Sequence, residues 1–238
     1  MKVLQILPQL NIGGVERGTL DLSKALIQKG HESFVVSGGG ILVDELIQSG
    51  AKHYEIPVHI KSLRTLSLAK NLSKTISSID PDIVHVRSRM PAWVNFRAFK
   101  MLQKKPLLIS TFHGLYSFPI YSQVMSFVDH SIAISKTVEK YILKNYKLNK
   151  NDITVIPRGC DPAEFNNNSV NPHHKAEILN EFPQIVGKKV LTIPGRITKW
   201  KGVAEFIELL SLLDGSYHGL IVGPVSYTHL TLPTNREV

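Results

Sequence analysis

Residues 3–37 read VLQILPQLNIGGVERGTLDLSKALIQKGHESFVVS, and this stretch decides the fold. A short apolar run, Val3–Leu7, precedes a helical pattern over Val15–Lys29 and a second apolar run, Ser33–Ser37. The two runs are almost continuously apolar, as expected of strands that are covered on both faces. The stretch therefore predicts a parallel strand–helix–strand unit.

The same alternation continues along the chain and sets the fold class. Right-handed crossovers between such strands give an α/β fold with a Rossmann-like, doubly wound parallel sheet. Further strands are predicted at Ile83–Val86, Leu107–Ser110, Ser131–Ile134 and Ile153–Ile156, and further helices at Ile41–Ser49, Pro91–Gln103 and Lys136–Asn145.

The sequence texture changes after Ile156, where prolines, asparagines and paired histidines replace the regular alternation. We expect a first domain over 1–165, a linker over 166–187 and the start of a second Rossmann-like domain over 188–223. In that last part a strand, a helix and a strand are predicted at Val190–Ile193, Val203–Leu213 and Leu220–Val222. These elements cover too little apolar surface to close a core, so the second domain is expected to be incomplete.

The last residues, Val225–Val238, read VSYTHLTLPTNREV and differ from everything before them. They resemble the translation of an adapter sequence left at the end of a sequencing read. We therefore expect the segment 224–238 to be non-native, and the natural chain to be truncated near Gly223.

The composition is that of a soluble globular protein with a basic surface. Lys and Arg number 28 against 19 Asp and Glu, which gives a net charge of +9. No apolar run reaches the ~18 residues that a membrane span needs, so a cytoplasmic protein is expected. The charge predicts either a solvated surface or peripheral contact with an anionic membrane at the inner face of the cell membrane, and no nucleic-acid motif accompanies it. The lone Cys160 is expected to be buried and to bind no metal.

Two loops of the first domain are candidate ligand sites. Gly13 and Gly14 lie between a strand and a helix, where glycine lets the backbone approach an anion, although a tight turn alone would also explain them. Their spacing does not match the dinucleotide-binding fingerprint. His113 lies in the loop predicted to start at Thr111, at the carboxyl edge of the sheet, and is the candidate catalytic residue; a structural role is the alternative.

Two basic clusters complete the candidate site. His85 lies at the end of the neighbouring strand, and Arg87 and Arg89 follow it. The three residues are candidates for binding an anionic acceptor, with solvated arginines as the alternative. Arg196 and Lys201 lie in the glycine-flanked loop of the second domain, where they are expected to bind a diphosphate.

Several ordered strings together resemble the retaining glycosyltransferases of family four. They are Gly13-Gly14, Pro81–His85, Ser110–Gly114, Ala133–Ser135, Val155–Asp161 and Gly195–Gly202. The likeness runs from Met1 to about Gly223, and Ser88–Trp93 with the RGCD and RITKWKG strings looks like the bacterial branch that acts in lipopolysaccharide or capsule assembly.

The resemblance implies the GT-B fold and a function. A hexosyl unit would pass from a nucleotide-diphosphate sugar to a glycan or lipid-linked acceptor with retention. Arg196 and Lys201 would hold the donor diphosphate, Gly13 and Gly14 would line the donor cleft, and His113 would lie by the reacting centre. Neither a metal nor a cofactor is implied.

The resemblance also sets limits. The family's acidic E-x7-E motif does not occur here, so the chain alone is expected to be inactive. A nucleotide-sugar epimerase on the same scaffold and a non-catalytic sugar-nucleotide-binding protein remain the alternatives.

Overall fold

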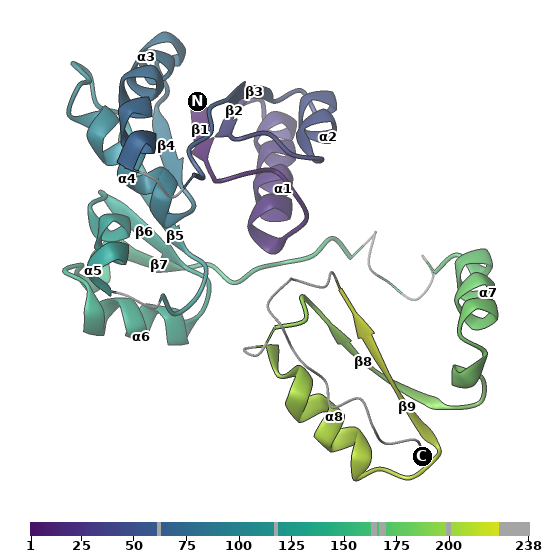
Figure 1. Cartoon of the computed structure of the whole chain (residues 1–238). Coiled ribbons are helices and arrows are strands. Elements are labelled where there is room, and N and C mark those ends of the chain that lie inside the picture. The colour runs from purple at the N-terminus through teal and green to yellow at the C-terminus, as the bar shows by residue number, and fades with distance from the viewer. Residues whose placement is uncertain (61–62, 117–118, 163–165, 167–169, 199–200, 224–238) are drawn as a thin grey trace. The chain divides into compact units, whose positions relative to one another are not determined.

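The computed structural model describes residues 1–60, 63–116, 119–162, 166, 170–198 and 201–223. The chain divides into two compact units, Met1–Gly159 and Cys160–Val238 (Figure 1). The expected domain end at 165 and the expected non-native tail at 224–238 lie outside the described residues. The segment that the sequence predicts as a linker, 166–187, contains helix α7 (Pro172–Glu181).

Unit 1 is built on one sheet of seven parallel strands in the order β3-β2-β1-β4-β5-β6-β7, which confirms the predicted fold class. The chain therefore builds outward from β1 in one direction and from β4 in the other. The strands are β1 (Lys2–Ile6), β2 (Glu32–Ser37), β3 (Lys52–Glu55), β4 (Ile83–Val86), β5 (Leu107–Phe112), β6 (His130–Ala133) and β7 (Ile153–Val155).

Helices cover both faces of this sheet (Figure 1). Successive residues of β2 point to opposite faces: Phe34 and Val36 belong to one apolar core, and Val35 belongs to the other. The smaller core lies under α1 and α2, and the larger core lies under α3, α4 and α6. The α-helices are α1 (Gly14–Gln28), α2 (Val43–Gln48), α3 (Ala69–Ile79), α4 (Arg89–Phe99), α5 (Pro119–Ser122) and α6 (Lys136–Asn145); the 3₁₀ helices are η1 (Leu63–Leu68), η2 (Gln123–Ser126) and η3 (Lys150–Asp152).

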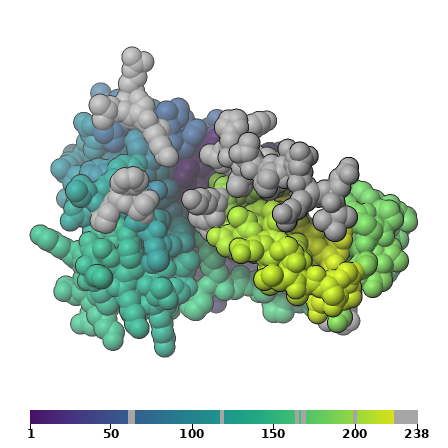
Figure 2. Space-filling model, turned by 60° about the horizontal axis from the view of Figure 1, so that its bottom comes forward, coloured from purple at the N-terminus to yellow at the C-terminus, as the bar shows by residue number. Residues whose placement is uncertain are grey.

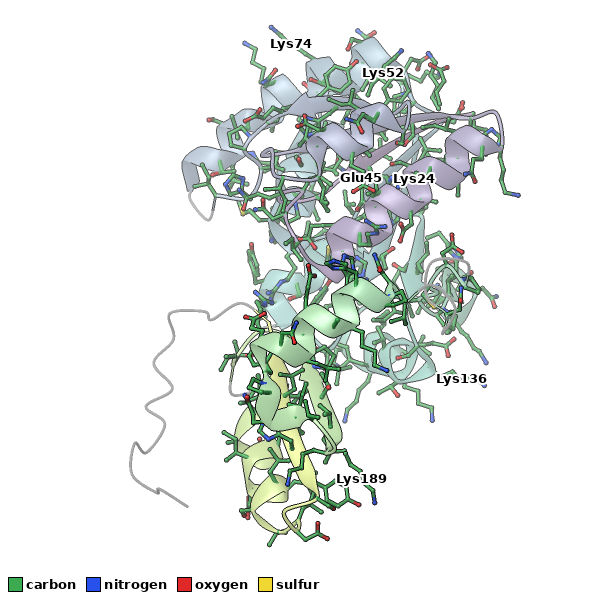
Figure 3. All side chains as sticks on the ribbon, turned by 90° about the vertical axis from the view of Figure 1, so that its right-hand side faces the viewer. Lys24, Glu45, Lys52, Lys74, Lys136 and Lys189 are labelled. Carbon is green, nitrogen blue, oxygen red and sulfur yellow. The ribbon has the colours of Figure 1, made fainter. Side chains whose placement is uncertain are left out.

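Local sequence explains where these helices begin and end. Gly30 follows α1 with φ 75°, a left-handed conformation that glycine adopts without steric cost. The Ser135 hydroxyl accepts a hydrogen bond from the Val138 amide and caps α6. Lys24 of α1 and Glu45 of α2 point toward one another and form an ion pair at 2.9 Å (Figure 3).

Several elements of unit 1 differ from the sequence prediction; helix α4, for example, spans Arg89–Phe99 rather than Pro91–Gln103. Strand β3 is not predicted because it is a short, polar strand at the sheet edge that pairs only with β2. Helix α3 is not predicted either, although Leu72, Ile76 and Ile79 form its buried face. Strand β5 runs two residues further than expected, so Thr111 belongs to the strand and His113 is the first residue after it.

Unit 2 contains a two-stranded parallel sheet and few buried apolar side chains. Strands β8 (Lys189–Pro194) and β9 (Tyr217–Val222) pair in register, and α8 (Val203–Ser211) connects them. Among the described residues of the unit, Ile185, in the 3₁₀ helix η5 (Pro183–Ile185), and Val203 are the buried hydrophobic ones. The yellow-green residues of the unit form much of its visible surface in Figure 2.

Cys160 is exposed, so the expectation of a buried cysteine is wrong. The residue stands in the extended segment that begins unit 2, outside any packed element. None of the helices in the described ranges combines the length and apolar character that crossing a bilayer requires.

Candidate active site

The candidate site of unit 1 lies at the carboxyl edge of the sheet, beside the point where the strand order reverses. Strands β1 and β4 are neighbours, but their connections leave toward opposite edges of the sheet. Open α/β sheets bind ligands at such a point. The segments that follow β1, β4, β5 and β7 supply Gly14, Arg87, His113 and Arg158, and hydrogen bonds and charge interactions join these residues in one cluster.

Arg87 is buried, with 7% of its surface exposed. Its Nη1 donates to the Gln5 side-chain oxygen at 2.7 Å and to the Gly18 carbonyl at 3.2 Å. The alternative of a solvated arginine is therefore wrong. Burial, followed by the charge of Arg158, lowers the pKa of Arg87 to about 10, so the guanidinium stays charged at neutral pH.

A polar network under α1 holds Arg87. Gln5 is fully buried on β1, and its Nε2 donates to the Thr19 carbonyl and to Ser23 Oγ of α1. Gly18 lies inside the same helix, where glycine costs about 1 kcal/mol relative to alanine. A Cβ at Gly18 would lie 3.2 Å from Nη2 of Arg87, so a larger residue there would crowd the buried guanidinium.

His85 is a buried strand residue, with 2% of its surface exposed. Its Nε2 pairs with Thr111 Oγ1 of β5 at 2.7 Å. Burial, Arg87 and His113 together hold the pKa of His85 well below its ordinary value of 6.5. His85 is therefore a buried side chain of β4, and it is not exposed at the carboxyl edge of the sheet, where the sequence places it. Its binding of an acceptor stays a prediction.

His113 is held by contacts on two sides. Its Nδ1 lies 2.8 Å from Nη2 of Arg158, and its backbone amide donates to the Tyr116 hydroxyl at 3.4 Å. Burial, then Arg87 and Arg158, lowers the pKa of His113 to about 3. Its Nε2 is buried and makes no hydrogen bond within the part of the chain that the structure describes. The imidazole is thus neutral at physiological pH.

Arg158 joins His113 to the N-terminus of α1. Its Nη1 donates to the Gly14 carbonyl. A Cβ at Gly14 would lie 2.6 Å from that nitrogen, so a larger residue there would displace the end of the Arg158 side chain. Arg158 is not among the candidate residues predicted from the sequence. The signal was present, because Arg158 follows β7, whose carboxyl end lies on the same edge of the parallel sheet as the ends of β1 and β5.

Arg89 opens α4 beside two aromatic rings. Its guanidinium carbon lies 5.0 Å from the ring centroid of Tyr116 and 5.4 Å from that of Tyr121. Nη1 also donates to Ser122 Oγ at 3.3 Å. A guanidinium held against aromatic faces is a cation–π arrangement. Whether Arg89 binds an acceptor stays a prediction.

The predicted diphosphate loop belongs to unit 2. Arg196 and Lys201 are both exposed in the connection between β8 and α8. The Lys201 side chain lies along Gly195, because a Cβ there would be 3.6 Å from its Cδ and Cε. Gly202 caps α8 with φ 76°. Lys199 and Trp200 of the same loop lie outside the described residues.

The four predicted donor residues are thus divided between the two units, Gly13 and Gly14 in the first and Arg196 and Lys201 in the second. Within the described ranges, no three His, Cys, Asp or Glu side chains gather as they would around a metal ion.

Solved structures resemble the chain over nearly its whole length. A glycosyltransferase from Rickettsia africae is 32% identical, with a TM-score of 0.76, and the match covers 95% of this chain and 61% of that one. Anabaena HepE, solved with UDP and glucose, has a TM-score of 0.77 at 16% identity, covers 95% of this chain and 62% of its own, and supports the fold alone.

Curated relatives match at lower identity. A human subunit of phosphatidylinositol N-acetylglucosaminyltransferase is 25% identical over 187 residues, 71% of this chain and 38% of its own length. An uncharacterized glycosyltransferase of Methanocaldococcus jannaschii is 28% identical over 174 residues, 66% of this chain and 41% of its own length. The chain thus spans about two fifths of the length of these relatives. The family model described as Glycosyltransferase Family 4 matches residues 12–164, and the chain belongs to that family.

Proposed function

We propose that the protein acts in the transfer of a hexosyl unit from a nucleotide-diphosphate sugar to a glycan or lipid-linked acceptor, with retention of configuration. The observation that carries the proposal is a cluster of four residues at the carboxyl edge of the sheet: Gly14, Arg87, His113 and Arg158. All four residues lie in the part of the chain that the model of glycosyltransferase family 4 matches. The pathway we propose is assembly of lipopolysaccharide or capsule polysaccharide in the bacterial branch of the family. A lipid acceptor agrees with the name of the human relative.

The donor side of the proposal rests on charge. When the glycosidic bond breaks, negative charge accumulates on the departing diphosphate, and cations placed there stabilise the transition state. Arg196 can bind phosphate oxygens with its planar fork, and Lys201 supplies a compact charge. Gly13 and Gly14 allow the donor phosphate and sugar to approach the backbone. Basic groups thus take the role that a metal ion has in other transferases.

The test uses the protein with a panel of nucleotide sugars and acceptor glycans. We expect acceptor-dependent release of the nucleoside diphosphate, and a product whose anomeric proton coupling matches that of the donor. An epimerase would convert the nucleotide sugar without an acceptor. A binding protein would show a dissociation constant without turnover. Either result, or a product of opposite configuration, would contradict the corresponding part of the proposal.

We propose further that the basic surface of unit 1 contacts an anionic membrane from the cytoplasmic side. Lys136, Lys140 and Lys144 are exposed on α6, and Figure 3 shows Lys136 directed away from the fold. Several lysines near a surface of anionic lipid attract it with about 1 kcal/mol each, and salt screens this attraction.

Co-sedimentation with vesicles tests this contact. We expect binding to vesicles that contain phosphatidylglycerol, loss of binding at high salt, and weaker binding after all three lysines of α6 are changed to Gln. The matched control changes three exposed lysines elsewhere on unit 1: Lys70, Lys74 and Lys105. Equal binding by both triple variants, or binding that salt leaves unchanged, would count against the contact through α6.

A further inference from the structure

The contact between Arg158 and His113 determines which imidazole nitrogen carries hydrogen. All five polar hydrogens of a guanidinium are donors, and the group has no acceptor. Since Arg158 Nη2 lies 2.8 Å from Nδ1 of His113, Nδ1 must be the acceptor. In a neutral imidazole the hydrogen then resides on Nε2. The second arm of the same guanidinium donates to the Gly14 carbonyl.

The surroundings of His113 favour the same neutral form. The cations facing it are Arg87, which follows β4, and Arg158, which follows β7. His85 of β4 interacts electrostatically with Arg87 and His113, and the His113 amide donates a hydrogen bond to the Tyr116 hydroxyl. The charge of Glu16 raises the pKa of Arg87 and so opposes the effect of burial. Burial and the two guanidiniums lower the pKa of the His113 imidazole to about 3.

We propose that Arg158 is a positioning residue, which fixes His113 as the neutral tautomer with hydrogen on Nε2 and ties it to the turn at Gly14. His113 Nε2 then offers one hydrogen-bond donor, and it makes no hydrogen bond to any residue that the structure describes. The consequence, which rests on the proposed function, is that His113 Nε2 donates a hydrogen bond to an oxygen of the transferring sugar or of the acceptor. It does not take up the proton of the acceptor hydroxyl.

Nitrogen-15 spectra of histidine-labelled protein test the tautomer without any substrate. The His113 signals are assigned by their loss in His113→Asn. We expect the wild-type imidazole to show the Nε2–H pattern and not to titrate between pH 5 and pH 8. A hydrogen on Nδ1, or titration near pH 6.5, would overturn the proposal from the wild-type spectrum alone.

Variants at position 158 separate positioning from simple packing. Arg158→Met keeps an unbranched apolar stem but removes donor and charge; we expect the pKa of His113 to rise and the imidazole to become a mixture of tautomers. Arg158→Lys keeps a donor and a charge and is expected to restore the Nε2–H form. Unchanged His113 signals in a folded Arg158→Met protein would contradict the proposal.

A pair of glycine variants gives a second route to the same contact. The Cβ of Gly14→Ala would meet Arg158 Nη1 at 2.6 Å, whereas that of Gly159→Ala meets no atom within 4 Å. We expect the first to shift the His113 signals as Arg158→Met does, and the second to leave them unchanged. Equal spectra for both would count against the proposal. Because these spectra need no sugar nucleotide, their outcome is independent of whether the protein transfers sugar.

Discussion

The guanidinium of Arg87 donates a hydrogen bond to the side-chain oxygen of Gln5 over 2.7 Å, and so connects the residue after β4 to the middle of β1. Both side chains are buried. Strands β1 and β4 flank the point where the strand order reverses. The bond therefore connects the two strands beside which the candidate site lies. Removing one partner of such a buried pair is costly, because the other partner is left without a hydrogen bond.

Replacing Arg87 with Met should destabilise unit 1 by about 2 kcal/mol, because the Gln5 oxygen and the Gly18 carbonyl lose a donor in a buried place. Urea unfolding followed by circular dichroism measures the change. Arg97→Met is the matched control, since Arg97 is exposed on α4, and its effect should stay within about 0.5 kcal/mol. Equal unfolding midpoints for the two variants would show that the bonds of Arg87 contribute no stability.

The stability of unit 1 should fall as the pH drops below 6.5. The folded pKa of His113 is about 3 against an ordinary value of 6.5, so in that window the unfolded chain takes up a proton that the folded chain cannot. Stability from this group is complete above pH 6.5 and is lost down to about pH 3. His85, whose folded pKa is also depressed, acts in the same direction.

Urea unfolding at pH 7.5 and pH 5.0 checks this dependence. His113→Asn should lose less stability between the two pH values than wild type does, by up to about 2 kcal/mol, since one pKa unit corresponds to about 1.4 kcal/mol. His174→Asn, at an exposed position on α7, should retain the wild-type dependence. A His113→Asn protein with the wild-type pH dependence would contradict the depressed pKa.

The amides of the small sheet in unit 2 should exchange with solvent faster than those of β1. Four of the five residues of β1 are buried, whereas every residue of β8 and β9 is partly or fully exposed. Local opening is easiest where few apolar contacts hold the backbone. Hydrogen exchange read by mass spectrometry compares peptides from the two sheets. Equally slow exchange in both would contradict the expectation.

The fold was predictable because strand and helix patterns depend on local sequence. The near-continuous apolar runs gave the central strands, and the carboxyl-edge rule placed His113 at the site. The polar edge strand β3 could not be found this way, since its residues carry no apolar run. A strand at the sheet edge needs fewer apolar side chains than a central strand does.

The chemistry of the site was less predictable, because it depends on contacts between distant residues. The general weakness of exposed charges favoured a solvated Arg87, and the structure buries it. The lone Gln5 within an apolar strand was a signal, since a buried amide needs partners. Gly14 follows β1, His113 follows β5 and Arg158 follows β7, so the three meet only once the seven-stranded sheet has formed. No short motif contains that information.

For the proposed transfer reaction, Arg196→Ala and Lys201→Ala should each lower kcat about a hundredfold or more. The physical reason is that charge grows on the leaving diphosphate only as the bond breaks, and losing one group that stabilises such charge costs about 3 kcal/mol. Arg97→Ala and Lys74→Ala, which remove exposed cations of unit 1, are the controls and should leave kcat within a factor of two.

His113→Ala should lower kcat with little change in the dissociation constant of the nucleotide sugar. His113 lies in the other unit from Arg196 and Lys201, and it is proposed to contact the reacting sugar or the acceptor. Steady-state kinetics and calorimetric titration with the nucleotide sugar separate these effects. Near-normal turnover of the Arg196→Ala and Lys201→Ala enzymes would remove the assignment of the diphosphate site, whereas a His113→Ala enzyme that binds donor weakly but turns over at the normal rate would place His113 on the donor instead.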